Sequence, residues 1–179
     1  MGGVHSELKL QRVHSMKGTF ISDKIIISVD AKEIHDGLGE IINSNRELNI
    51  FEAMYLIDRQ LIEIDDFDKK SFAQKCAEID KRFWIKYRVF NDLKNRGYKF
   101  VRSGLKYGCD FRLYPREFKS MNDGHASHVI FCFSDIEQIA ANHFSAMVRV
   151  ANSTRKKLMI GIVDGEGSVT YYEIMWIRP

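Results

Sequence analysis

The stretch CDFRLYPREFKSMNDGHASHVIFCF, residues 109–133, contains two strand patterns of different kinds. In its first part polar and apolar residues alternate, which is typical of a strand with one buried and one polar face. Phe111 and Leu113 fall on the apolar face, whereas Tyr114 falls on the polar face with Arg112. Tyr114 is therefore expected at a strand end, facing outward.

The second pattern is the apolar run HVIFCF, residues 128–133, which is continuous enough to be a strand buried on both faces. Residues 115–124 form a polar loop between the two strands, and His125 stands just before the second one. We expect this loop to return the chain so that His125 lies beside Tyr114.

The C-terminal part predicts a helix and a hairpin. Ser134 and Glu137 have the spacing of a capping box, and apolar residues follow at helical intervals, so a helix over 135–151 is expected to pack on the sheet. The strand LMIGIV (158–163) and a closing β-rich run flank the turn DGEG (164–167), which predicts a β-hairpin.

The N-terminal part predicts a small α/β unit. Short strands are expected in TFISDKIIISV (19–29), and a helix from about Glu47. Its apolar stripe consists of Ile50, Phe51, Ala53, Met54 and Ile57.

Residues 71–98 are helical in character. Ser71 and Gln74 have capping-box spacing and Gly97 is a stop signal. Because the run is long for one globular helix, we place a break at 80–82.

These patterns predict an α/β (α+β) fold in two parts. Residues 1–81 form a small mixed α/β domain, and residues 82–179 form a second domain with a central mixed sheet flanked by helices.

Composition excludes several classes of protein. The net charge is +3, from 27 basic and 24 acidic residues, which is too balanced for a nucleic-acid binder to be inferred from charge alone. Cys76, Cys109 and Cys132 show neither a disulfide framework nor zinc spacing. Since no apolar run is long enough to span a bilayer and the polar start has no signal-peptide pattern, we expect a cytoplasmic protein.

Several conspicuous residues have ordinary structural explanations. Tyrosine is common at sheet edges, as Tyr114 would be, and a lone histidine such as His125 is commonly a surface residue. The run from Arg155 to Lys157 fits a solvated helix end that favours positive charge.

The motifs also leave open a metal-dependent site. Asp110, Glu117 and Lys119 resemble the carboxylate set of magnesium-dependent nucleases, but only six residues separate Asp110 from Glu117, too few for the usual strand, turn and strand. His125 and His128 are three residues apart, so on a strand they would point to opposite faces rather than share a metal.

The second half as a whole resembles the tRNA-splicing endonucleases. The resemblance rests on YRVFNDLKNRGYKFVRSGLKYGCDFRLY (87–114), HASHVIFCF (125–133) and VRVANSTRKKLMIGIVDGEGSVTYYEIMWIRP (148–179). The segment ELNIFEAMYLI is similar to a helix in the small first domain of single-chain archaeal members. This implies a nuclease-like C-terminal domain that acts as a tRNA-intron lyase.

The resemblance assigns three catalytic residues. Tyr114 ends a DFRLY-like strand, His125 opens the next strand, and Lys156 follows an arginine in an SxRKKL-like segment. They would be base, acid and electrostatic stabiliser of a transesterification that needs no metal and no cofactor. Because the reference pKa of tyrosine is about 10, a base of this kind requires neighbouring positive charge.

The family's substrate is precursor tRNA, cut at two splice sites of a bulge-helix-bulge RNA that is recognised by its shape. The resemblance implies that Arg149 and Trp176 grip a bulged base, and that Arg155, next to the lysine, is an RNA-binding residue.

Two cuts in a pseudo-symmetric RNA imply two active sites related by a two-fold axis, so one gene product must self-assemble. A single chain with both the small first domain and all three catalytic residues resembles the homotetrameric archaeal members of the family. Asp164 and Glu166 in the DGEG turn would dock on a partner subunit, although acidic turns are also common for local reasons. The other interpretations are a non-catalytic structural subunit of a heteromeric enzyme and the magnesium-dependent nuclease.

Overall fold

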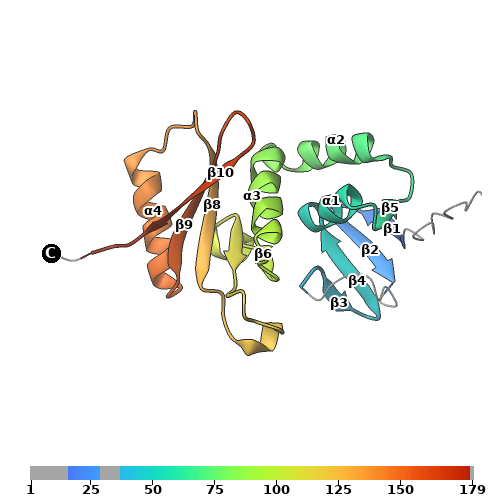
Figure 1. The fold of residues 1–179 in the computed structure, drawn as a ribbon, viewed down its shortest axis with the longest axis horizontal. Helices are drawn as coiled ribbons and strands as arrows, with labels where there is room; N and C mark the ends of the chain where they lie inside the picture. Colours follow the sequence, from blue (N-terminus) through green and yellow to red (C-terminus); the bar gives the residue numbers. More distant parts are fainter. Residues whose placement is uncertain (1–15, 29–36, 178–179) are drawn as a thin grey trace, which may run out of the picture.

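The computed structural model describes residues 16–28 and 37–177. This part of the chain contains two five-stranded sheets and four α-helices, which gives the mixed α/β fold predicted from the sequence (Figure 1). None of its helices combines the length and the apolar character that a membrane span requires.

The first sheet has the strand order β3-β4-β2-β1-β5. Its neighbours are antiparallel except for β1 and β5, which run parallel. The strands are β1 (Met16–Ile21), β2 (Lys24–Ser28), β3 (Glu40–Ile42), β4 (Asn45–Asn49) and β5 (Ile62–Ile64). The strands expected over 19–29 are present up to Ser28, and Val29 lies outside the described residues.

Helix α1 (Ile50–Asp58) carries the predicted apolar stripe on its inner face. It begins three residues later than expected, because Asn45–Asn49 pairs with β2 as a strand. Asn49 then caps the helix by accepting hydrogen bonds from the amides of Phe51 and Glu52.

Helices α2 (Lys69–Ile79) and α3 (Phe83–Asn95) are separated at 80–82, as predicted. The predicted capping box was wrong. The helix begins earlier because Asp68 and Ser71 cap it reciprocally: the Asp68 carboxylate accepts from the Ser71 amide at 2.7 Å, and the Ser71 hydroxyl oxygen accepts from the Asp68 amide at 3.0 Å. Gly97, with φ +88°, ends α3 as expected.

The second sheet has the order β10-β9-β8-β7-β6, and β8 and β9 are its parallel pair. The elements in this half are β6 (Val101–Ser103), β7 (Phe111–Leu113), β8 (His128–Ser134), β9 (Lys157–Val163) and β10 (Val169–Ile174), with short 3-10 turns η1 (Leu105–Tyr107) and η2 (Met121–Asp123). The predicted hairpin is present as β9 and β10.

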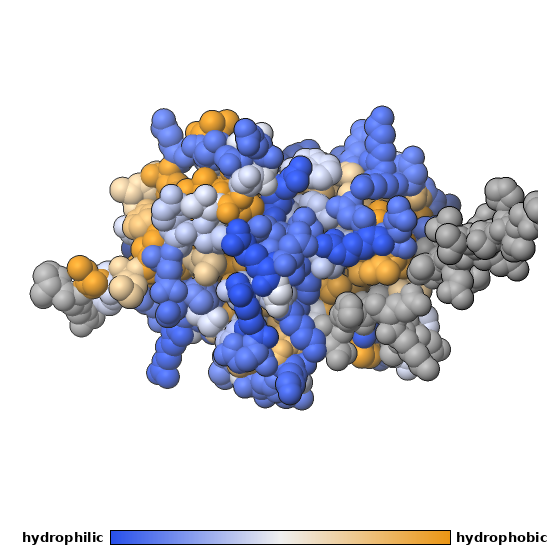
Figure 2. Space-filling view, viewed as in Figure 1, coloured by the Kyte–Doolittle hydropathy of each residue, from blue (hydrophilic) through white to orange (hydrophobic). Residues whose placement is uncertain are grey.

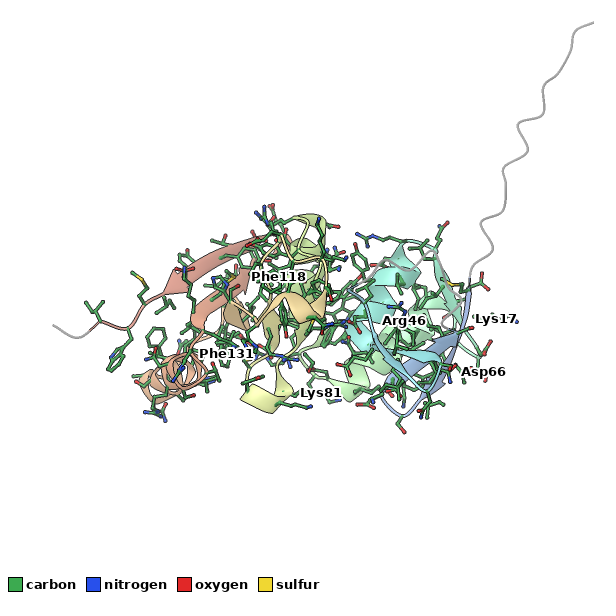
Figure 3. The ribbon with its side chains drawn as sticks, turned by 90° about the horizontal axis from the view of Figure 1, so that it is seen from below. Lys17, Arg46, Asp66, Lys81, Phe118 and Phe131 are labelled. Atoms are coloured by element: carbon green, nitrogen blue, oxygen red, sulfur yellow. The ribbon has the colours of Figure 1, made fainter. Side chains whose placement is uncertain are left out.

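Strand β8 is buried on both faces, as its apolar run predicts. Ile130 and Cys132 lie in the core that contains α3, whereas Phe131 and Phe133 lie in the core formed with α4. Figure 3 shows Phe131 against α4. The two helices therefore cover opposite faces of the sheet.

Helix α4 (Ala141–Ser153) starts six residues later than the helix expected over 135–151. The Glu137 carboxylate does accept from the Ser134 amide at 3.1 Å, but it also accepts from Arg82 at 2.9 Å, and no helix follows at once. Ile136, the first of the apolar residues expected at helical intervals after Ser134, is 87% exposed. The residues with capping-box spacing therefore form a turn, which Arg82 at the start of α3 contacts through Glu137.

One hydrophobic core runs across both sheets. The ring of Phe51 stacks on Phe83 at a centroid distance of 5.4 Å and meets Phe111 edge-on at 5.3 Å. In Figure 1, α3 lies between α1 and the second sheet. The two sheets lie on either side of the boundary placed at residue 81, but they share this core.

Candidate active site

The register of the second sheet brings three strand ends together at one edge. Leu113 of β7 pairs with His128 of β8, and His128 pairs with Lys157 of β9. Tyr114 directly follows β7, and Lys156 directly precedes β9. Since neighbouring strands are about 4.8 Å apart, β7 and β9 lie about 10 Å apart across β8 at this edge.

The connection before β8 joins this edge through backbone hydrogen bonds. The Ser127 amide donates to the Leu113 carbonyl at 2.8 Å, and the Lys157 amide donates to the Ser127 carbonyl at 3.0 Å. His125 lies two residues before Ser127. The three residues assigned as catalytic are thus carried by the same edge of one sheet.

The environment of Tyr114 differs from the exposed one expected from the sequence. It shares a face with Arg112, as the alternation predicts, but its side chain is only 4% exposed. The ring packs with Phe100 and Phe118 at centroid distances of 6.2 and 6.4 Å, and with Ala126. Phe118, labelled in Figure 3, comes from the loop after β7, which folds back over the tyrosine.

A cation, Arg112, reaches the Tyr114 hydroxyl. Nη1 of Arg112 donates to it at 3.5 Å. The Arg112 guanidinium also lies over the ring of Tyr107, with Cζ 5.3 Å from the centroid, and Nζ of Lys156 lies 5.8 Å from the same centroid. Tyr107 and Arg112 were not assigned to the site from sequence. The one available signal was the position of Arg112 two residues before Tyr114.

His125 is exposed and has no hydrogen-bond partner among the residues that the structure describes. It follows Gly124, whose φ is +148°, and precedes Ala126, which is buried against Tyr114. The backbone is therefore anchored one residue away, while the imidazole is accessible to a ligand.

Lys156 and Arg155 are positioned by the end of α4. The Arg155 amide donates to the Asn152 carbonyl and the Lys156 amide to the Ala151 carbonyl, which together form a Schellman motif. Arg155 occupies the left-handed position of this motif, with φ +53°. Its side chain is exposed, and Lys156 leaves the helix end toward Tyr107.

The two residues expected to hold a bulged base line one groove. Arg149 comes from α4 and Trp176 from the segment after β10. The groove has a volume of about 590 Å³, and its other walls come from the outer face of α4. These residues are Phe144, Ser145, Val148, Asn152 and Ser153.

Asp164 and Glu166 lie in the turn between β9 and β10, and both are exposed. The Asp164 carboxylate accepts from the amides of Glu166 and Ser168 at 3.0 and 2.9 Å. Asp164 therefore stabilises its own turn. This is the local role that the sequence leaves open as an alternative to subunit contact.

The carboxylates of the magnesium alternative have other environments. Asp110 pairs with Lys86 at 3.1 Å and accepts from the Cys132 amide at 2.8 Å, at the start of β7. Glu117 and Lys119 lie beyond the other end of that strand. Among residues 16–28 and 37–177, no three His, Cys, Asp or Glu side chains form a potential metal site.

His128 does not join His125. Its Nε2 lies 2.9 Å from Glu173 Oε2, and its Nδ1 lies 2.8 Å from the Ser127 hydroxyl. Because His128 and Lys157 both contact Glu173, they hold the pKa of that carboxyl below its usual value.

Comparison with known families matches both halves of the chain. Residues 16–74 match the family described as tRNA intron endonuclease, N-terminal domain. Residues 83–171 match the family described as tRNA intron endonuclease, catalytic C-terminal domain. The predicted boundary at 81 falls in the interval between the two matches.

Curated relatives match over most of their length. The tRNA-splicing endonuclease of Methanococcus maripaludis is 36% identical over 167 residues, which cover 88% of this chain and 93% of the relative. Those of Pyrococcus abyssi and Nanoarchaeum equitans are 36% and 34% identical, over 79% and 78% of this chain and 82% and 94% of theirs. Both domain matches and these relatives show that the chain belongs to the tRNA-splicing endonuclease family, whose members are RNA endonucleases.

Proposed function

We propose that this tRNA-intron endonuclease cuts precursor tRNA at the two splice sites of a bulge-helix-bulge motif by metal-independent transesterification. The observation that carries the proposal is the shared sheet edge of Tyr114, His125 and Lys156. Arg112 at the Tyr114 hydroxyl, together with Lys156 beside the ring of Tyr107, supports the choice of Tyr114 as the base.

The reaction rearranges bonds at one phosphodiester. The ribose 2′-oxygen forms a bond to the adjacent phosphorus, and the bond from phosphorus to the 5′-oxygen breaks. The phenolate of Tyr114 takes the 2′-hydroxyl proton, and protonated His125 gives its proton to the departing 5′-oxygen. Lys156 stabilises the negative charge that grows on the phosphorane. The products are a 2′,3′-cyclic phosphate and a 5′-hydroxyl, and no co-reactant is consumed.

The burial of Tyr114 adds a condition. Because its side chain is only 4% exposed, Phe118 and its loop must shift for the hydroxyl to reach a ribose. Fluorescence of a Phe118→Trp variant, compared with the parent chain, should change when RNA binds. Unchanged emission in the bound complex would contradict this movement.

RNA recognition is assigned to the surface beside the site. The groove between Arg149 and Trp176 offers a guanidinium and an indole to a splayed base, and stacking of this kind contributes about 1–3 kcal/mol per base. Exposed Arg155, next to Lys156, is placed to meet a phosphate.

Assembly as a homotetramer, a dimer of dimers, completes the proposal: two cuts require at least two sites, and the chain carries both domains of the family. Exposed Glu166 and the Asp164 turn are the proposed contacts with a partner subunit. The C-terminal segment is also apolar: Met175 and Ile177 are 75% and 74% exposed, and Figure 2 shows apolar surface around this end of the molecule. The proposed location of the assembly is the cytoplasm.

The test is cleavage of an end-labelled bulge-helix-bulge RNA by the purified chain in excess EDTA. Cleavage at both bulges supports the proposal. Activity that appears only with magnesium would favour the carboxylate alternative of Asp110, Glu117 and Lys119. No cleavage in either condition would identify a structural subunit that requires a catalytic partner.

A further inference from the structure

Arg112 stands out because its guanidinium reaches the Tyr114 hydroxyl, although the residue also lines a hollow with Glu40, Glu47 and Glu52. Its Nε donates to the Ser103 carbonyl at 2.9 Å, which fixes the plane of the guanidinium, and Nη1 donates to the Tyr114 hydroxyl oxygen at 3.5 Å. Among the described residues, no carboxylate lies within ion-pair distance of Arg112, whereas Arg102, its neighbour across the strand pair, is paired with Glu52 at 3.0 Å.

Tyr107 provides a second contact. Its ring, at the end of η1, lies beside both Arg112 and Lys156, with the charged centres 5.3 and 5.8 Å from the centroid. Both cations are attracted to the same π-system, so the ring keeps two like charges in one small region. Arg112 is thus held from two directions, by Ser103 and by Tyr107.

We propose that Arg112 is a positioning residue of RNA cleavage: it orients the Tyr114 hydroxyl and stabilises its phenolate, and Tyr107 holds Arg112 in place. The inference rests on the proposed function, in which Tyr114 is the base. Guanidinium has no acceptor, so it leaves the phenolate oxygen available for the ribose proton. A charge acts more strongly on a buried group than on one in water, so Arg112 is placed to act on Tyr114.

Two other cations near the site, Lys99 and Arg116, have contacts elsewhere. Nζ of Lys99, beside Phe100, donates to the Lys119 carbonyl at 2.8 Å. Arg116 lies over the ring of Tyr98, at 4.4 Å from the centroid. The remaining charged or titratable groups on these elements, and in the hollow that Arg112 lines, are Asp23, Lys24, Glu40, Glu47, Glu52, Arg102, Lys106, Asp110, Glu117, Lys119, Asp123, His125, His128 and Lys156. Among the described residues, Arg112 alone has a hydrogen bond to the Tyr114 hydroxyl.

The test compares Arg112→Gln and Arg112→Lys with the parent chain in single-turnover cleavage, with saturating RNA in EDTA, across pH. The matched control is Arg59→Gln, since Arg59 also lies over a tyrosine ring, that of Tyr55 at 3.5 Å, but on the first domain. We expect Arg112→Gln to cleave about 10- to 100-fold more slowly at neutral pH with unchanged RNA affinity. The limb of the rate profile that rises with pH should move to higher pH, because the charge beside the phenolic oxygen is lost.

Arg112→Lys should recover part of the rate, because an ammonium keeps the charge but not both hydrogen bonds. Arg59→Gln should follow the parent profile. In a Tyr114→Phe background, Arg112→Gln should cause little further loss, because the group on which it acts is gone.

Two results would overturn the inference. One is an Arg112→Gln variant that cleaves at the parent rate or is slowed equally at every pH, and the other is an undiminished effect in the Tyr114→Phe background. If Arg112→Gln does not fold, Arg112→Lys takes its place in the test. Cleavage by Arg112→Lys at the full parent rate, with an unchanged dependence of rate on pH, would then contradict the inference. Failure of the parent chain to cleave in EDTA would instead contradict the proposed function.

Discussion

The carboxylate of Glu52, in helix α1, accepts a hydrogen bond from Nη1 of Arg102, on edge strand β6, at 3.0 Å. Both side chains are buried, and Glu52 also accepts from the amides of Gly39 and Asn49 at 3.1 and 3.0 Å. Burial raises the pKa of the Glu52 carboxyl, and Arg102 opposes that shift. The pair joins the first half of the chain to the sheet that carries the candidate site.

Loss of one partner should therefore destabilise the fold. Glu52→Ala leaves the Arg102 charge buried and unpaired, and we expect a loss of about 3–5 kcal/mol in unfolding free energy, measured by urea denaturation. The control is Glu47→Ala, which removes a more exposed pair with Lys24 at 2.6 Å and should cost much less. Equal, small losses in the two variants would contradict the structural role of this pair.

Tyr114→Phe should separate catalysis from folding. The ring stays packed against Phe100 and Phe118, and only the hydroxyl is lost. We expect cleavage to fall by about 10² to 10⁴, with an unchanged circular dichroism spectrum and melting curve. Tyr172→Phe, at an exposed tyrosine of β10, is the control and should cleave normally. If Tyr114→Phe keeps full activity, the tyrosine is not the base.

Arg155→Gly tests whether Arg155 acts on RNA or only on the helix end. Glycine adopts φ +53° without strain, so stability should rise by up to about 1 kcal/mol. RNA affinity should fall, and the slope of its dependence on salt should decrease by about one. Arg155→Ala removes the same charge but keeps the backbone strain. It should therefore weaken RNA binding equally without the gain in stability; unchanged affinity in both variants would make Arg155 purely structural.

The assembly is best tested at Glu166. Asp164 is unsuitable, because its carboxylate holds the turn through two backbone amides. Glu166→Lys should give species smaller than a tetramer at moderate salt, measured by light scattering. Asp135→Lys, the same charge reversal at another exposed acid, should leave the mass unchanged. A tetramer that survives Glu166→Lys would remove this residue from the interface.

Much of the second sheet could be predicted from the sequence because its patterns are local. The period-two alternation up to Leu113 and the apolar run from His128 give both strands and their faces. The register of three strands places the backbone of Tyr114, His125 and Lys156 at one edge of the sheet, and their catalytic roles stay a prediction from the motif resemblance.

The predictions were wrong where tertiary contacts determine the start of a helix or the burial of a side chain. Ser134 and Glu137 have capping-box spacing, but Glu137 is also paired with Arg82, fifty-five residues earlier in the chain, and the helix begins only at Ala141. Alternation gives the face on which Tyr114 lies, but it cannot show that Phe118 returns to cover that face. The contacts of Arg112 and Tyr107 likewise depend on how η1 folds onto the sheet edge.

The most direct measurement is the chemistry of the RNA ends left by the purified chain in EDTA. The account predicts that polynucleotide kinase labels the new 5′ end without prior phosphatase treatment, because it is a hydroxyl, and that the other end is a cyclic phosphate. Both follow from attack by the ribose oxygen with Tyr114 as base and His125 as acid. A 5′-phosphate and a free 3′-hydroxyl would show that water is the nucleophile and would contradict the account.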